Sequence, residues 1–156
     1  MMLIGAAGCG SGGSKAGSGL GVPRQRVIDT LTSQGTVFSM KEYHEEGKEP
    51  IYSGLSDRYQ ATLTFSGPVA NPTSASFVIP ISVTNFMENA PKLAVAETFL
   101  GQFTPEAGEW MKRTLESHPL TGRFVESITL DHDDFQLRCG PLANARALIS
   151  LTVTPH

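Results

Sequence analysis

The sequence predicts an α+β domain built on a mostly antiparallel sheet of about five to seven strands. Its candidate strands come in two groups, one before and one after a pair of candidate helices, and they do not alternate with helices one by one. Strands bunched in this way favour an antiparallel sheet, with an N-terminal helix and a central helix pair packed on one face. The length of 156 residues fits a single domain.

Composition excludes several classes of protein. Hydrophobic residues make up 40% of the chain and charged residues 17%, which is too apolar for a disordered chain. The net charge of −3 provides no basic excess, so we expect no nucleic-acid partner. No apolar run approaches the ~18 residues of a membrane span. Two cysteines are too few for a disulfide-rich scaffold.

The domain opens with a predicted helix over residues 22–35. Pro23 suits the first helical position and Gly35 suits the stop. A strand is expected over residues 36–43, and a short one over 51–53, on either side of a charged turn.

The clearest strand signal covers residues 58–65, where apolar and polar residues alternate strictly. Alternation of this kind predicts one buried and one solvated face. The inward set is Tyr59, Ala61, Leu63 and Phe65. The outward set, a possible binding face for a protein partner or a glycan, is Arg58, Gln60, Thr62 and Thr64.

A second alternating strand is expected over residues 74–81. Pro80 cannot donate to a ladder, which predicts an edge position or a strand end there. Two helices should follow as an αα-hairpin. We expect the first to run from an Asn89 cap to Gly101, and the second to open at Thr104, which a proline follows. Strands over 124–130, 135–139 and 147–153 complete the domain.

Three acidic residues in the turn after residue 130 are weak metal candidates: Asp131, Asp133 and Asp134. An EF-hand loop counted from Asp131 would need glycine at its sixth position and glutamate at its twelfth, and these hold Gln136 and Leu142. An Asp-rich hairpin turn is the ordinary explanation.

Glu126 is an unusual carboxylate, because it lies between Phe124 and Ile128 on an apparently apolar strand face. A carboxylate there is costly unless a partner balances it. Cys139 shares the parity of inward residues and should be a buried, inert thiol.

The first residues differ in composition from the domain. A short apolar run leads to Ala6-Ala7-Gly8-Cys9, and a Gly/Ser-rich stretch follows. This tetrapeptide resembles the lipobox of bacterial lipoproteins. The resemblance implies cleavage before Cys9, acylation of Cys9, and division into a partial signal peptide (1–8), a flexible tether (9–21) and one domain (22–156). We expect further signal residues upstream of Met1, and no core residue from the tether.

The same stretch admits two other interpretations. Gly8, Gly10 and Gly13 fit the G-x-G-x-x-G pattern of a dinucleotide-binding loop, although that pattern needs a preceding strand and a following helix. A plain unstructured tail is the other alternative.

The segment GVPRQRVIDTL that follows the tether is similar to the first helix of small outer-membrane-assembly lipoproteins, with Pro23 where their pattern has Ser or Thr. These resemblances imply a lipid-anchored, extracytoplasmic module of a bacterial envelope, and since the sequence contains no recognisable catalytic constellation, we expect it to bind a ligand without catalysis. Its expected partners are the membrane, through the anchor, and an envelope protein or glycan, with no cofactor. The alternative function is a soluble nucleotide-binding protein or enzyme that uses Gly8–Gly13.

Overall fold

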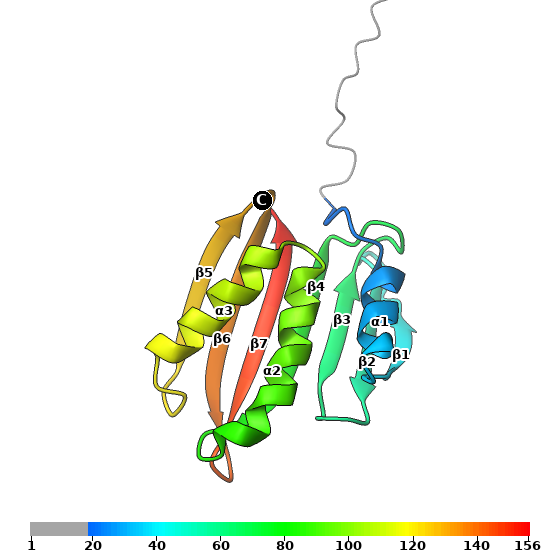
Figure 1. Ribbon diagram of the computed structural model, residues 1–156. Helices are drawn as coiled ribbons and strands as arrows, with labels where there is room; N and C mark the ends of the chain where they lie inside the picture. Colours follow the sequence, from blue (N-terminus) through cyan, green and yellow to red (C-terminus); the bar gives the residue numbers. More distant parts are fainter. Residues whose placement is uncertain (1–18) are drawn as a thin grey trace, which may run out of the picture.

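The computed structural model describes residues 19–156, which form three helices and one seven-stranded sheet (Figure 1). In chain order the elements are α1 (Arg24–Ser33), β1 (Phe38–Tyr43), β2 (Ile51–Ser56), β3 (Thr62–Ser66), β4 (Ser74–Ser82), α2 (Phe86–Gly101), α3 (Pro105–Ser117), β5 (Phe124–Leu130), β6 (Asp133–Leu142) and β7 (Arg146–Pro155). The strand order is β1-β2-β3-β4-β7-β6-β5, and every neighbouring pair is antiparallel. The α+β class is therefore confirmed.

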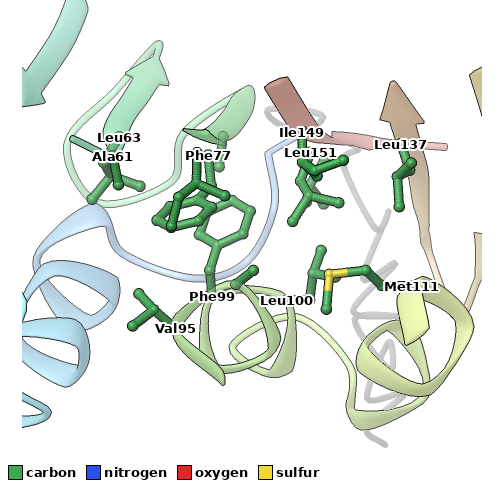
Figure 2. Close-up of a cluster of buried hydrophobic side chains, with 14 of the residues drawn as sticks. Ala61, Leu63, Phe77, Val95, Phe99, Leu100, Met111, Leu137, Ile149 and Leu151 are labelled. Carbon is green, nitrogen blue, oxygen red and sulfur yellow. The ribbon is translucent and has the colours of Figure 1, made fainter. Parts of the chain in front are cut away.

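All three helices lie on one face of the sheet (Figures 1 and 2). Because successive side chains of a strand point to opposite faces, alternate residues such as Leu63, Phe77 and Leu151 enter the core. They meet Phe99 of α2 and Met111 of α3, and all five side chains are fully buried. The Phe77 and Phe99 rings stack with their centroids 5.5 Å apart. Among the described residues, no helix is long and apolar enough to cross a bilayer.

The helix pair forms the predicted αα-hairpin, and α3 begins directly after Thr104 as expected. The Thr104 hydroxyl donates to the Glu106 carboxylate and accepts no capping hydrogen bond from a backbone N–H. The two helices approach closely at Gly108, where a Cβ would lie 2.8 Å from Glu97 Cγ. Any larger residue at position 108 would therefore force the Glu97 side chain to shift.

The prediction that Pro80 marks an edge strand or a strand end is wrong, because β4 lies in the middle of the sheet and continues to Ser82. Val83 donates its N–H to the carbonyl of Ala145, the residue just before β7, so the Val83 N–H points to the β7 side. The N–H groups of successive residues in a strand point to opposite sides. The Pro80 nitrogen therefore faces the β3 side. Pairing between β3 and β4 stops at Val78, so the missing N–H interrupts no ladder.

The Asn89 cap is also wrong, because α2 begins three residues earlier, at Phe86. The Asn89 side chain instead accepts from the Ser82 N–H and donates to the Ser82 C=O, both at 2.7 Å. Lys92 donates to the Pro80 carbonyl at 3.3 Å. Past Val78, β4 has no strand on its β3 side. Side chains of α2 make the hydrogen bonds there that a neighbouring strand would otherwise make.

The domain begins earlier than the predicted boundary at Val22. Leu20 is buried in the core, and its N–H donates to the Pro72 carbonyl at 2.8 Å. Gly21 donates its N–H to Asn71 Oδ1, also at 2.8 Å. The expectation that the tether supplies no core residue fails at Leu20, an apolar residue among glycines that packing holds in place.

Candidate functional site

The face of the sheet opposite the helices is covered by no element of residues 19–156 (Figure 1). The sequence placed four residues on it, and two of them do lie there. Thr62 and Thr64 point away from the core from β3. Arg58 and Gln60 do not, because β3 begins at Thr62 and both precede it in a turn. Gln60 has a φ of 53°, which breaks the alternation of an extended strand.

Cross-strand pairing places Thr64 in a row of polar side chains that crosses all seven strands. Each member is the register partner of the next, so neighbours lie about 4.8 Å apart. From β1 to β5 in spatial order the row is Lys41, Ser53, Thr64, Ser76, Thr152, Gln136 and Ser127. We call this set the polar row.

The polar row has four uncharged hydroxyl residues in succession, on β2, β3, β4 and β7: Ser53, Thr64, Ser76 and Thr152. Two of their hydroxyls have no hydrogen-bond partner among the described residues. Ser53 and Thr64 share a hydrogen bond of 2.7 Å. Within residues 19–156, no hydrogen bond joins the hydroxyls of Ser76 or Thr152 to another protein group. These two half-buried hydroxyls remain free to donate to and accept from a ligand.

Two hollows flank the polar row at the two ends of the sheet. One, of about 500 Å³, lies over β5, β6 and β7 and includes Ser127, Gln136 and Thr152 in its lining. The other, of about 360 Å³, lies over β1, β2 and β3, beside Lys41 and the exposed ring of Tyr43. The uncovered face therefore presents hydroxyl, amide and aromatic groups together.

The acidic turn is engaged in contacts within the chain. Asp131 occupies the hairpin turn with a φ of 54°. Hydrogen bonds from Thr129 and His156 lower the pKa of Asp134, and burial raises the pKa of Asp133. In the part of the chain that the structure describes, no three His, Cys, Asp or Glu residues gather as metal ligands would.

Glu126 has a polar partner, His118, on the helix-facing side of the sheet. It lies on the helix-facing side of β5, between Phe124 and Ile128 as predicted, and is half-buried. Its carboxylate meets His118 Nε2 at 3.2 Å, and the imidazole ring stacks on Phe124 with centroids 4.3 Å apart. His118 follows α3, so the sequence pattern of the strand could not identify it.

An apolar groove of about 620 Å³ lies on the other side of the molecule, between α2, α3 and the segment that follows α3. Its apolar lining includes Ile81, Val83, Phe86, Leu93, Leu115 and Leu120. Three of its polar lining residues, Asn89, Lys112 and His118, are engaged within the chain. Lys112 pairs with Glu97 at 2.9 Å and Glu109 at 3.4 Å, and the Glu97 hydrogen bond raises the pKa of Lys112.

The remaining sequence candidates lie outside the polar row. Cys9 and the Gly8–Gly13 loop lie outside the described residues. Cys139 is buried as predicted, and burial raises the pKa of its thiol.

Sequence patterns alone could not reveal the polar row, because it joins residues up to 111 positions apart, from Lys41 to Thr152. Within single strands the signal was the recurrence of Ser and Thr at alternate positions. No protein-family model, no curated protein and no solved structure matches this chain.

Proposed function

We propose that this protein is a lipid-anchored, extracytoplasmic binding module of a bacterial envelope, with no catalysis of its own. Its ligand is the neutral, hydroxyl-rich sugar backbone of an envelope glycan, peptidoglycan, which lies across the uncovered face of the sheet. The observation that carries the proposal is the polar row, with its free Ser76 and Thr152 hydroxyls.

The chemistry of the face matches a sugar chain. Ser and Thr hydroxyls both donate and accept hydrogen bonds, as sugar hydroxyls do. The row adjacent to the polar row adds apolar patches at Leu55 and Val78 that suit the C–H faces of sugar rings. Tyr43 is 55% exposed beside one hollow and offers a ring for stacking.

The charge of the face disfavours other ligands. Ser53, Thr64, Ser76 and Thr152 are neutral, and Lys41 and Arg138, which are cations of this face, lie far apart on β1 and β6. A phosphate-bearing polymer would need clustered cations instead. The apolar groove is a weaker candidate for a sugar chain, because most of its lining is apolar and its one lysine, Lys112, is already paired within the chain.

Anchoring is the second half of the proposal. The Ala6-Ala7-Gly8-Cys9 tetrapeptide supports acylation at Cys9, and two or more acyl chains hold a protein stably on a membrane. The packing of Leu20 fixes where the folded domain starts, which leaves ten residues, 10–19, as the span between it and Cys9.

Binding is tested with purified peptidoglycan sacculi and the full chain carrying Cys9→Ser. The double variant Ser76→Ala/Thr152→Val removes the two free hydroxyls and leaves the hydrogen bond between Ser53 and Thr64 in place. We expect about tenfold weaker co-sedimentation, because two hydrogen bonds contribute roughly 0.5–1.5 kcal/mol each.

The matched control is Ala90→Gln, which places a longer side chain in the apolar groove from an exposed helix position. It should leave binding unchanged. Loss of binding in Ala90→Gln, with none in the double variant, would place the site in the groove. A wild-type chain that ignores the sacculi would contradict the glycan proposal.

Anchoring is tested separately. With a complete signal in a bacterial host, the protein should incorporate labelled palmitate, and Cys9→Ala should abolish the label. Label retained in Cys9→Ala would overturn the assignment of the acylated residue.

A further inference from the structure

The sheet has two edges, β1 and β5, and they differ in how they are protected. We infer that β5 is a self-association edge, at which two copies of the chain pair their β5 strands antiparallel about Ser127. This inference is independent of the glycan proposal, since it rests on backbone groups and not on the polar row.

The β1 edge carries the features that prevent strand pairing. Lys41 lies in the middle of the strand, and Glu42 follows it. Arg24 of α1 reaches Glu42 at 3.7 Å, so a helix end also lies against this edge. Charged side chains, lysine above all, are the usual protection of an exposed edge.

The β5 edge carries none of them. Its sequence, FVESITL, contains no lysine, arginine or proline, and its seven residues pair with β6 without a bulge. The one acidic side chain, that of Glu126, lies on the helix side of the strand with its carboxylate 3.2 Å from His118 Nε2 of the same chain. Val125 is 55% exposed. A regular, weakly charged edge of this kind is a template for another strand.

The hydrogen-bond pattern shows which β5 groups are free. His156 donates its N–H to the His132 carbonyl, so even-numbered residues of β6 bond to β7. Odd-numbered residues of β6, such as Phe135 and Leu137, therefore bond to β5, where their partners are Ile128 and Glu126.

The residues between these partners point their N–H and C=O groups away from the sheet. They are Val125, Ser127 and Thr129. These three residues present a row of unpaired donors and acceptors along the edge.

An antiparallel copy fits this edge in a defined register. With Ser127 opposite Ser127 of the second copy, all three outward residues fall in hydrogen-bonded pairs, since Val125 then faces Thr129. Phe124 faces Leu130, and Glu126 faces Ile128. Side chains on the helix side meet helix-side partners, so apolar residues oppose apolar residues at both ends of the seam.

Apolar surface beside the edge favours the same partner. Phe124, Ile128 and Leu130 pack against the core but stay partly exposed, because α3 contacts β5 sparsely. A two-fold axis through Ser127 would bring both sets together beneath the helix layers. The polar rows of the two copies would then meet end to end at Ser127, which gives one continuous uncovered face.

The mass of the full chain is the direct test. Light scattering after gel filtration should give a mass approaching twice 16.7 kDa as the concentration rises to about 100 µM, since a small interface binds weakly. Ser127→Pro removes the outward N–H and spares the β6 ladder, so it should stay monomeric. Ser127→Ala keeps that N–H and should dimerise like the wild type. Circular dichroism confirms that each variant is folded.

Crosslinking tests the register. In a chain with Cys9→Ser, Ser127→Cys should form an intermolecular disulfide on oxidation, because the two positions face each other across the axis. Thr129→Cys should not, since its two copies would lie roughly 13 Å apart, four residues along the strands.

Several outcomes would overturn the inference. These are a wild-type chain that stays monomeric at every concentration, a folded Ser127→Pro that still dimerises, equal crosslinking at positions 127 and 129, or a mass above that of a dimer. Each is independent of whether sacculi are bound.

Discussion

Leu63 and Thr62 are neighbours in β3 that face opposite sides of the sheet. Leu63 is fully buried beneath the helices, whereas Thr62 lies on the uncovered face. Leu63→Ala should lower the free energy of unfolding by about 2–5 kcal/mol, through lost transfer energy and the cavity left behind. Chemical denaturation of the variant and the wild type measures the difference.

Thr62→Ala is the matched control for this change. It removes strand propensity and little packing, so about 0.5 kcal/mol is expected. Equal losses in the two variants would mean that the second face of the sheet is covered as well.

Asn89 bonds both backbone groups of Ser82 from a position that is 2% exposed. Asn89→Ala leaves a buried N–H and a buried C=O without partners, each costing roughly 1–3 kcal/mol. We expect a loss of about 2–4 kcal/mol in thermal or denaturant melts.

Asn85 provides the control, because it occupies the N-cap position of α2 but makes no side-chain capping bond and is exposed. Asn85→Ala should cost under about 0.5 kcal/mol. A larger loss in Asn85→Ala than in Asn89→Ala would mean that helix capping outweighs the bonds to Ser82.

Residue environments were predictable where they depend on strand parity alone. Parity alone predicts that Leu63 and Cys139 lie in the core and that the Glu126 carboxylate needs a partner. The partner, His118, comes from outside the strand, and periodicity carries no information on such contacts. For the same reason Asn89 was assigned to a helix cap, a local role, when its bonds are tertiary.

Elements were predictable where local chemistry decides them. The proline after Thr104 marks the start of α3, and the bounds of β5 match those expected from its sequence. Proline disfavours the middle of a sheet because it lacks the N–H that a neighbouring strand would accept. At Pro80 this has no effect, because β3 ends before it and offers no carbonyl on that side. The turn at Gln60 shortened β3 although the side-chain alternation continued through it.

The N-terminal segment offers a test at the scale of an element. A chain shortened to begin at Val22 loses the burial of Leu20 and its hydrogen bond to Pro72. Burying a leucine contributes about 1.5–3 kcal/mol, so we expect unfolding to become easier by roughly 2 kcal/mol. A chain that begins at Gly19 should match the full chain in denaturant melts. Identical midpoints for the two shortened chains would mean that Leu20 contributes nothing.

The order of strands belongs to the whole molecule and could not be predicted from single segments. Strands β1, β2, β3 and β4 lie side by side in chain order. Next to β4 the sheet continues with β7, β6 and β5, so the two groups join where β4 pairs with β7. The polar row exists only because of this junction, since Ser76 and Thr152 become neighbours there. Its members were visible in the sequence, but their alignment was not.

The same junction predicts how the molecule unfolds. Phe77 of β4 contacts Phe38 of β1, stacks on Phe99 of α2 and is the register partner of Leu151 in β7, so one core links both groups of strands to the helices. A shared core makes unfolding of a domain of this size a single cooperative step.

Trp110, the one tryptophan, is buried in α3 and reports on the C-terminal part of the domain, while far-ultraviolet circular dichroism reports on all elements. In dilute protein the two signals should give one denaturant midpoint. Phe77→Ala should lower both signals' midpoints equally, by an amount equivalent to about 3–5 kcal/mol. Midpoints that separate, in the wild type or in Phe77→Ala, would mean that the β1–β4 and β5–β7 groups unfold as independent units.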